Sequence, residues 1–487
     1  MLDESTEWGK ILTQGSQDQI AEALAEAMCT DPVLKEWLDA CEGWETPLYD
    51  LCSGSGGSYG ILRRVVEKLR SRGKNFGYEL LGLSDKDPTS QRFLRLCGHK
   101  PVYGNCLDLL RDTAYCHATD KPVPVKKLGR SAEKPAVAAG IECGGSSPQN
   151  AFRITQGVSL EDEGGKPKTT KTASSFFATK SVIDVMDAPC ILYENNVYIE
   201  GCSKSHSIYN DMCRLLAPKY SPETAHLSSE KSDPQTRLRA FLAFGQDEAT
   251  IGHFPELVSR MEKALVAKPW PHYLLTAEEA ERDESIELFC NTTRALVPFA
   301  GELTSARPYY ERKGLTLPDD IPAGMGKEFY KVPADYMFKG DAGLTKRGRL
   351  VTHWGGNLFD MWQLVPFDSF AVFHAEYSIA KRLSRTILQV EIFPTITEKP
   401  EWLICVPALK RCSLISISEL YALNGMPLVD LTPMSLTDLC ARFTYHELSS
   451  LCGRAFRAPS GAIALLALML MHKPTCEALA RRALPSA

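Results

Sequence analysis

The sequence predicts an α/β fold whose first half contains a parallel sheet. From residue 47 onward, short apolar runs alternate with helical patterns, and glycine-rich or acidic turns follow the apolar runs. The chain has 487 residues, of which 44% are hydrophobic and 24% charged, so it is large enough for two domains or one elaborated domain. In such folds ligands bind at the carboxyl ends of the strands, where we expect the functional residues.

The elements of this sheet follow one another in a regular order. Apolar residues at 19–28 have helical spacing and Pro32 opens a second helix, so residues 1–46 are predicted to form a helical N-terminal extension. Strands are then predicted at 47–52, 78–83, 101–103 and 136–139, with helices at 59–72 and 88–97. This βαβαβ order favours parallel pairing.

The remainder of the chain has a less regular pattern. Residues 118–135 are rich in Pro and Lys and are expected to form a loop, and 157–175 are poor in apolar residues. The second segment predicts either a mobile loop, which could cover a reacting group, or an ordinary surface loop. Further strands are expected near the end of 183–193 and at 240–245, and helices at 416–423 and 459–471; an irregular second domain is expected at 246–405.

Composition restricts the setting in which the protein works. The net charge of −5 does not favour nucleic-acid binding, so such binding would need a local basic patch. Sixteen Cys without CxxC pairs favour a reducing compartment. The acidic N-terminus has no signal core, and the longest apolar run, 462–471, is shorter than the roughly 20 residues of a membrane span. We therefore expect a protein that is neither secreted nor in a membrane, with nuclear location in a eukaryote and cytoplasmic location otherwise.

A glycine-rich turn, DLCSGSGG at 50–57, joins the first strand to the first helix of the sheet. Glycines allow the backbone to approach a ligand, and the following helix start supplies N–H groups; a plain tight turn is the alternative. The candidate ligand-binding residues here are Asp50, Cys52, Ser53, Gly54, Gly56 and Gly57.

Polar residues also follow the next two strands. Asp85 is placed to accept both hydroxyls of a ribose, whereas Asp87, before Pro88, is placed to cap a helix. Asn105 and Cys106 follow the third strand, where a short polar side chain could reach an adenine or simply form a turn. Together with the glycine-rich turn, these residues are the candidate nucleotide-type site.

A candidate nucleophile, Cys143, lies on a Gly/Ser-rich loop just after the strand at 136–139. Most cysteines are small buried hydrophobes, so its position alone is weak evidence. Downstream lie a Glu-Asn pair beginning at Glu194 and a Gln-x-Arg-x-Arg string that contains Arg237 and Arg239. The order of these segments raises the weight of Cys143.

The whole series resembles the cytosine-5 methyltransferase family, whose members act with S-adenosylmethionine on DNA and, in one branch, on tRNA. The resemblance spans about 47–245 and returns at about 410–472. The segments at 50–57, 85–87 and 104–105 look like the cofactor motifs of the family. Residues 140–143 stand where the family has its Pro-Cys nucleophile, 193–196 resemble its Glu-Asn-Val motif, and 234–239 match its Gln-x-Arg-x-Arg motif. The segments at 417–427 and 453–459 look like the closing motifs.

The resemblance implies a Rossmann-like methyltransferase domain at 47–245 plus 406–475 and a target-recognition domain at 246–405. Cys143 would attack cytosine C6, Glu194 would activate the ring, and Arg237 with Arg239 would orient the base and backbone. The base would be flipped out of the duplex. The implied substrate is DNA, or RNA as an alternative, with no metal. Basic residues at 339–354 and 381–385 would then contact phosphates, although a solvated charged face is commoner.

Several residues depart from the family pattern. Glu142 replaces Pro beside the nucleophile, and its carboxylate would raise the pKa of the thiol. Other departures are Lys86, Asn105, Asn196 and Arg454. The alternatives are a catalytically degenerate scaffold that binds DNA or protein, an RNA cytosine methyltransferase and, more remotely, an unrelated NAD-binding enzyme.

Overall fold

The described part of the chain in this computed structural model divides into two compact units. One contains Ser16–Ala267, Asp430–Pro433 and Arg454–Ala487, and the other contains Met1–Gly15, Lys268–Val429 and Met434–Gly453. The structure describes residues 11–12, 15–129, 133–140, 159–162, 164–200, 208–228, 238–266, 270–275, 279, 283, 285, 371–374, 387–388, 393, 396, 402–406, 411–454 and 458–483. The predicted domain boundaries at 46, 245 and 406 stay a prediction.

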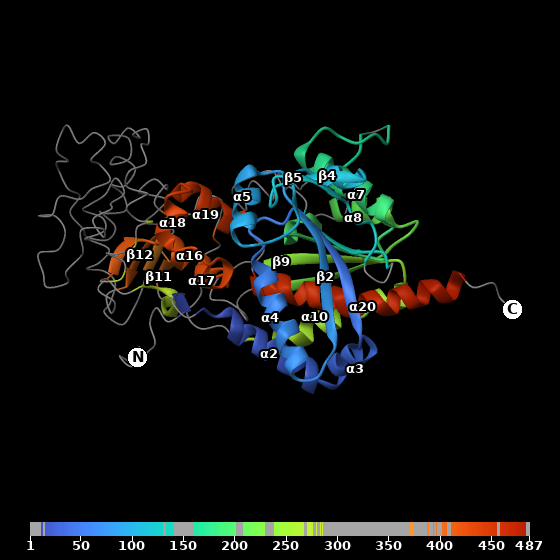
Figure 1. Cartoon of the computed structure of the whole chain (residues 1–487), viewed down its shortest axis with the longest axis horizontal. Coiled ribbons are helices and arrows are strands. Elements are labelled where there is room, and N and C mark those ends of the chain that lie inside the picture. Colours follow the sequence, from blue (N-terminus) through green and yellow to red (C-terminus); the bar gives the residue numbers. More distant parts are fainter. Residues whose placement is uncertain are drawn as a thin grey trace, which may run out of the picture. The chain divides into compact units, whose positions relative to one another are not determined.

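A nine-stranded sheet in the order β5-β4-β3-β2-β1-β6-β7-β9-β8 forms the centre of the first unit (Figure 1). The strands are β1 Trp44–Leu51, β2 Phe76–Ser84, β3 Val102–Tyr103, β4 Thr113–Cys116, β5 Lys121–Pro124, β6 Ala136–Gly140, β7 Cys190–Asn196, β8 Ser221–Ser228 and β9 Leu238–Gly245. Strands β3, β2, β1, β6 and β7 pair in parallel, whereas β9 is antiparallel to both β7 and β8. The strand order reverses direction at β1, so the predicted α/β, Rossmann-like fold class is confirmed.

Helices cover both faces of this sheet. The helices of the unit are α2 Gln17–Thr30, α3 Pro32–Ala40, α4 Gly57–Ser71, α5 Pro88–Leu96, α7 Lys171–Met186, α8 Ile208–Leu216, α9 Glu248–Ile251, α10 Phe254–Lys263 and α20 Ala458–Ala483, with short 3₁₀ turns η1 Cys106–Leu110 and η2 Val197–Glu200. Helices α4 and α20 contact the strands from one side, and α2 and α10 pack on these two helices. Helices α7 and α8 pack on the opposite side.

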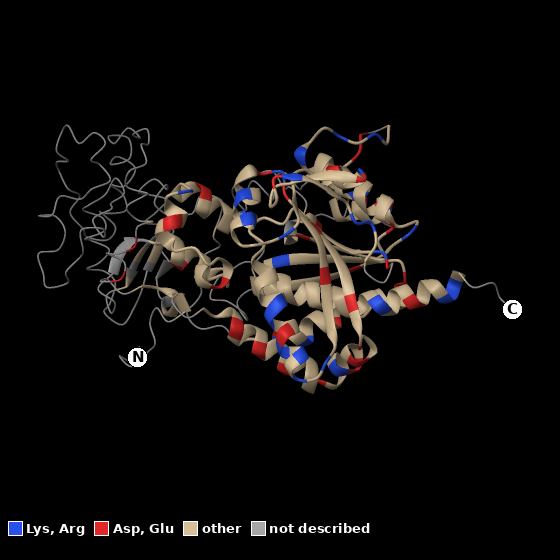
Figure 2. Ribbon diagram, in the orientation of Figure 1, with Lys and Arg blue, Asp and Glu red and all other residues tan. Residues whose placement is uncertain are grey.

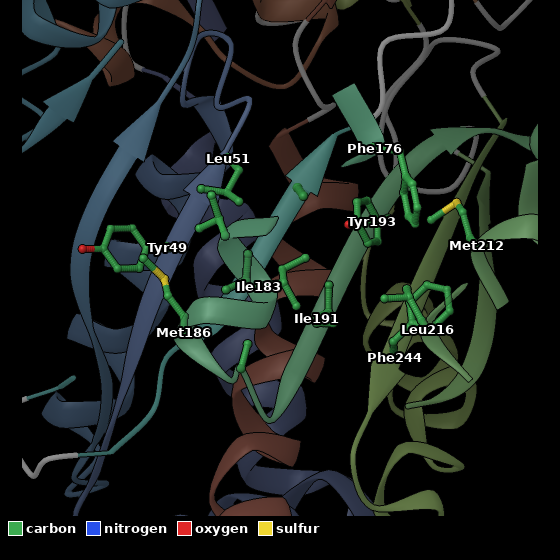
Figure 3. Packing of buried hydrophobic residues seen from close by; sticks show 14 of the residues in the cluster. Tyr49, Leu51, Phe176, Ile183, Met186, Ile191, Tyr193, Met212, Leu216 and Phe244 are labelled. Carbon is green, nitrogen blue, oxygen red and sulfur yellow. The ribbon is translucent and has the colours of Figure 1, made fainter. Parts of the chain in front are cut away.

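The face under α7 and α8 is a continuous apolar core. Figure 3 shows Ile183 and Met186 of α7 beside Tyr49 and Leu51 of β1. The cluster also contains Phe176, Ile191, Tyr193, Met212, Leu216 and Phe244. Because side chains alternate between faces along each strand, this layer fixes which strand residues point to α7 and α8 and which point to α4 and α20.

Helix α20 is the longest helix that the structure describes. Every residue from Ala458 to Met471 is buried, which confirms the helix predicted at 459–471. By length and composition α20 is apolar enough to cross a membrane, but 67% of its apolar window is buried within the protein. It contacts strands β1, β6, β7 and β9 and has the burial of a core helix.

Charged residues on the neighbouring helices are largely paired. Figure 2 shows acidic residues of α2 beside basic residues of α4. Lys68 contacts Asp18 and Glu22, each at 3.0 Å, and Arg72 after α4 pairs with Glu22. Such exposed pairs add little to the stability of the fold, because water screens them. Because they pair locally, these Lys and Arg side chains are balanced by neighbouring carboxylates.

The second unit contains a four-stranded antiparallel sheet in the order β11-β10-β12-β13. Its strands are β10 Ala371–His374, β11 Ile387–Leu388, β12 Trp402–Val406 and β13 Arg411–Leu414, and its helices include α16 Ile417–Leu423 and α18 Leu436–Cys440. Ser416 and Glu419 form a capping box at α16, and buried Glu419 also accepts the Leu275 N–H at 2.7 Å. The helix predicted at 416–423 is confirmed.

Two local expectations for the part of the chain before β6 were wrong. Strand β1 begins at Trp44, inside the segment predicted to be a helical extension, and the loop expected at 118–135 contains β5, which forms a hairpin with β4. Pro122 and Pro124 interrupt the strand pattern in the sequence, so β5 was not predicted. β5 is an edge strand, where proline is tolerated because one side of the strand needs no N–H donor.

The expected loop at 157–175 was wrong at its end, because helix α7 begins at Lys171. Thr170 caps this helix by accepting the Ala173 N–H at 3.2 Å. The start of the segment is anchored: Leu160 is fully buried, and its N–H donates to the buried carboxylate of Asp211 at 2.8 Å. The buried face of α7 includes Thr172 and Thr179, which weakened its helical pattern in the sequence.

Candidate functional site

The described candidate residues gather at one edge of the nine-stranded sheet. Leu51, the last residue of β1, pairs with Ser84 at the end of β2 and with Ala139 near the end of β6. Gly140 in turn pairs with Glu194 of β7. Strand register therefore places the glycine-rich turn, the Asp85 turn and Glu194 at the carboxyl ends of adjacent parallel strands, where ligands bind in open α/β sheets.

The glycine-rich turn is held by backbone hydrogen bonds to the end of β2. The N–H groups of Cys52 and Ser53 donate to the Ser84 carbonyl at 2.8 and 3.0 Å. Gly54 and Gly56 have φ of 57° and 68°, which favours glycine at both positions. A Cβ on Gly56 would also lie 2.8 Å from Leu94 Cδ2. The turn thus needs glycine both for its backbone conformation and for its close packing.

Helix α4 starts directly at the end of this turn, with Gly57 as its first residue. The Gly57 carbonyl accepts a hydrogen bond from buried Gln17 of α2 at 3.3 Å. Cys52, before the glycines, is exposed and has φ of 87°, and its Sγ lies 3.5 Å from the Gly140 carbonyl. The turn therefore contacts the end of β6 on one side and leads into α4 on the other.

Asp50 lies beneath the turn, with only 1% of its surface exposed. Burial raises the pKa of its carboxyl to about 7. Among the described residues, its Oδ1 has no hydrogen-bond partner. The neighbouring Ser53 hydroxyl donates to the Asp50 backbone carbonyl at 3.0 Å. This position makes Asp50 a support of the turn, and direct contact with a ligand stays a prediction.

Asp85 connects the two turns through both of its carboxylate oxygens. Oδ2 accepts the Gly54 N–H at 2.9 Å, and Oδ1 accepts the Asp87 N–H at 2.9 Å. Burial raises the pKa of Asp85, and the nearby charge of Asp87 raises it further, while these hydrogen bonds and the charge of Arg454 lower it. A carboxylate oxygen has a second lone pair, so each oxygen can still accept a hydroxyl.

The turn after β3 is capped by its own side chains. Asn105 Oδ1 accepts the Leu107 N–H at 3.0 Å, and Asp108 accepts the Asn105 N–H at 3.2 Å, at the start of η1. Asn105 itself is exposed. Burial raises the pKa of the adjacent Cys106 to about 11, so this thiol is protonated at neutral pH.

An ion pair joins the two described candidates for base recognition. Glu194 of β7 and Arg239 of β9 lie on adjacent antiparallel strands, and Glu194 Oε1 is 2.8 Å from Arg239 Nε. Their side chains are 15% and 19% exposed, so the pair is partly shielded from water yet still accessible. It presents a carboxylate and a guanidinium side by side, which suits a ligand edge that has both donors and acceptors.

Other candidate residues lie outside the described part of the chain. These are Cys143, Arg237 and the basic residues at 339–354 and 381–385. The described chain before Cys143 ends at Gly140, the strand partner of Glu194, and β9 begins at Leu238, directly after Arg237. Among the described residues, no group of three or more His, Cys, Asp or Glu side chains is arranged to hold a metal.

One contact at these strand ends involves a residue that was not predicted to belong to the site. Arg454, noted in the sequence only as a departure, forms an ion pair with Asp87, with Nη1 2.6 Å from Oδ2. Asp87 also caps α5 by accepting the Thr89 N–H at 3.0 Å, as predicted. No local signal could have identified the pair, because the two residues are separated by most of the chain.

No protein-family model matches this chain, and no curated protein sequence matches it. Among solved structures it is similar to a predicted DNA modification methyltransferase encoded within a prophage of E. coli, at 14% identity and a TM-score of 0.43, over 88% of this chain and 100% of that chain. It is also similar to S. pombe Dnmt2 methyltransferase, at 12% identity and a TM-score of 0.39, over 88% of this chain and 99% of that one. A mutant of Spodoptera frugiperda DNMT2 has 11% identity and a TM-score of 0.35, over 88% of this chain and 99% of that chain.

Proposed function

We propose that this protein transfers a methyl group from S-adenosylmethionine to C5 of cytosine in DNA, through a covalent adduct of Cys143. The observation that carries the proposal is the Glu194–Arg239 ion pair, which lies beside Gly140, where the predicted nucleophile loop begins. The glycine-rich turn and Asp85 occupy the same edge of the sheet. The proposed cofactor and target base would therefore meet at the ends of neighbouring strands.

The residues at the carboxyl ends of β1, β2 and β3 fit a nucleoside cofactor. Gly54 and Gly56 have positive φ, and a Cβ on Gly56 would meet Leu94 and His99, so the turn keeps its conformation only with glycine. The Asp85 carboxylate retains lone pairs for ribose hydroxyls. The proposed cofactor-binding set is Asp50, Cys52, Ser53, Gly54, Gly56, Gly57, Asp85, Asn105 and Cys106, which lie at or just after the ends of β1, β2 and β3. When bound, S-adenosylmethionine would supply an electrophilic methyl group.

The chemistry proposed for the catalytic residues begins at the thiolate of Cys143. Its addition to C6 would form a C–S bond and make C5 nucleophilic. C5 would then displace the methyl group from the sulfonium sulfur of the cofactor, which would keep the electron pair and leave as S-adenosylhomocysteine. Loss of the C5 proton to a base then expels the thiolate and restores the aromatic ring. Glu194 would hydrogen-bond N3 and the exocyclic amine, and Arg239 with Arg237 would hold O2 and the backbone.

The departure at Glu142 bears directly on the rate of this reaction. A carboxylate beside Cys143 disfavours the thiolate, so we expect a slow enzyme with an activity that rises with pH above neutrality. The same feature supports the alternative of a catalytically degenerate scaffold. An RNA cytosine-5 methyltransferase remains a further alternative, because the described site contains no feature that selects deoxyribose.

Adduct formation tests the proposal. The purified full chain and S-adenosylmethionine are mixed with mixed-sequence duplex DNA, or RNA of the same sequence, that contains 5-fluorocytosine. Fluorine at C5 blocks the final elimination, so a denaturation-resistant adduct is expected with DNA. Cys143→Ser should abolish it, and Cys29→Ser, on helix α2, is the matched control that should retain it.

The possible results separate the candidate functions. An adduct with RNA only would assign the RNA substrate. No adduct with either nucleic acid, from protein shown to bind S-adenosylhomocysteine, would overturn the proposed catalysis and favour the binding scaffold.

A further inference from the structure

A chain of polar contacts runs from the glycine-rich turn to the end of helix α19, Tyr445–Arg454. Gly54 N–H donates to Asp85, and Asp87 N–H donates to the other oxygen of the same carboxylate, both at 2.9 Å. Asp87 in turn pairs with Arg454 at 2.6 Å. The position of Asp85 therefore depends on the Asp87 backbone, and Arg454 contacts the side chain of that residue.

Each oxygen of the Asp87 carboxylate accepts a hydrogen bond. Its Oδ1 accepts the Thr89 N–H at the start of α5, and its Oδ2 faces Arg454. The helix cap fixes one end of the turn after β2, and the Asp85 backbone is held by the Tyr103 carbonyl at 3.2 Å and by Gln91 Nε2 at 2.7 Å. A charged hydrogen bond from Arg454 to the second oxygen adds a restraint on the Asp87 side chain.

Arg454 also acts on Asp85 through its charge. Burial raises the pKa of Asp85, which favours the protonated form, whereas the positive charge of Arg454 lowers it. An ionised carboxylate accepts two hydroxyls, while a protonated one has an O–H donor in place of one acceptor. The side chain of Arg454 is 45% exposed, so the ion pair lies in a partly aqueous setting with a moderate expected effect.

We propose that Arg454 is a positioning residue for a bound nucleoside: through its ion pair with Asp87 it holds the turn after β2 so that the Asp85 carboxylate meets both ribose hydroxyls. This role rests on the proposed function, because it requires a nucleoside cofactor at this edge. It assigns a purpose to a residue that departs from the family pattern, and it makes Arg454 part of the support of the cofactor site.

Calorimetric titration with two ligands tests this role. S-adenosylhomocysteine and its analogue without either ribose hydroxyl are each titrated into the full-length wild-type protein and into Arg454→Gln. We expect Arg454→Gln to raise the Kd for S-adenosylhomocysteine about five-fold, which corresponds to about 1 kcal/mol. The Kd for the dideoxy analogue should change less than about two-fold, because that ligand has no hydroxyls for Asp85 to accept.

Two control variants complete the experiment. Arg454→Lys retains the positive charge and should restore most of the affinity. Arg95→Gln removes an ion pair of similar exposure, with Asp120 at 3.3 Å, and should leave both Kd values unchanged. Thermal unfolding of each variant confirms that it is folded at the temperature of the titration.

The outcomes distinguish this inference from the proposed function. If the wild type binds S-adenosylhomocysteine and Arg454→Gln binds it equally well, the positioning role is overturned while the cofactor assignment stands. An equal loss for both ligands would mark a general structural effect and would also overturn the role. If the folded wild type does not bind S-adenosylhomocysteine, the proposed function and this role are overturned together.

Discussion

At the scale of single residues, Asp50 is a buried acid whose charge state affects the stability of the fold. Its pKa is raised by burial from an ordinary value of 3.8 to about 7. Between these values the folded protein binds more protons at this residue than the unfolded chain does. The free energy of unfolding contributed by Asp50 therefore falls as the pH rises from about 4 to about 7.

Replacement of Asp50 by Asn should reveal this effect. The neutral amide cannot ionise, so the stability of Asp50→Asn relative to wild type should increase by about 1–3 kcal/mol between pH 5 and pH 8. Urea unfolding at the two pH values measures the difference. Asp112→Asn, at a fully exposed side chain, should show no such change. A constant difference between Asp50→Asn and wild type at both pH values would contradict the buried, protonated state of Asp50.

Glu194 provides the second test at this scale. If it activates the cytosine ring as proposed, Glu194→Gln should lower kcat for methyl transfer by about 100-fold or more, because the amide cannot stabilise the protonated ring. The affinity for S-adenosylhomocysteine should be unchanged, since Glu194 is not one of the proposed cofactor-binding residues. Methyl transfer from labelled S-adenosylmethionine is the measurement.

A control for Glu194 is available on β2. Glu79 is largely buried and pairs with Lys126 at 3.0 Å, so Glu79→Gln also breaks an ion pair of a strand residue. We expect Glu79→Gln to retain kcat. Equal activity of Glu194→Gln and Glu79→Gln would rule out the catalytic role of Glu194.

At the scale of elements, the glycine-rich turn is determined by both backbone conformation and packing. Gly56 combines φ of 68° with close approach to Leu94 and His99. Gly73, after α4, has φ of 77°, but a Cβ at this position would have no neighbouring atom within 4 Å. The two positions thus separate the energetic cost of the left-handed conformation from the cost of crowding.

Alanine at each of these glycines tests this separation. Gly73→Ala should destabilise the fold by about 1 kcal/mol, the cost of a positive φ in an L-residue. Gly56→Ala should cost more, because a neighbour must also move, and it alone should weaken S-adenosylhomocysteine binding. Urea unfolding and calorimetry measure the two effects. If both variants bind the ligand as wild type does, the turn is a structural connection and not a cofactor cradle.

The end of the sheet also shows what element-level patterns can predict. The turn at 50–57, the Asp87 cap and the helices after them were predicted because each is encoded within a few consecutive residues. Helix α7 was missed because its buried face mixes Thr with apolar residues. The anchoring of Leu160 by Asp211 was missed because the two residues are far apart in the chain.

At the scale of the whole molecule, helix α20 packs a late segment of the chain against the central strands of the nine-stranded sheet. It contacts strands β1, β6, β7 and β9 and helix α4, whose start follows the glycine-rich turn. All of its residues from Ala458 to Met471 are buried, whereas the last turns, from Glu477, are largely exposed. We therefore expect the first half of α20 to be essential for the stability of this unit. The last turns should contribute less, chiefly through the ion pair of Arg482 with buried Asp247.

Two leucines of the same helix test this expectation. Leu466→Ala, at a fully buried position, should lower the free energy of unfolding by about 2–5 kcal/mol through lost burial and a cavity. Leu479→Ala, which is only partly buried, should cost less than about 1 kcal/mol. Urea unfolding of the full chain gives both values, and similar small losses would contradict a core role for α20.

The sequence by itself determined the α/β class, the order of most strands and helices in the sheet unit, and the set of residues at the strand ends. These features depend on local periodicity, glycine and capping residues, which act within one turn or strand. Only the tertiary structure decided that Glu194 pairs with Arg239, that Asp50 is buried below the turn, and that Arg454 contacts Asp87. Such contacts depend on strand register and helix packing between distant segments, which no local pattern encodes.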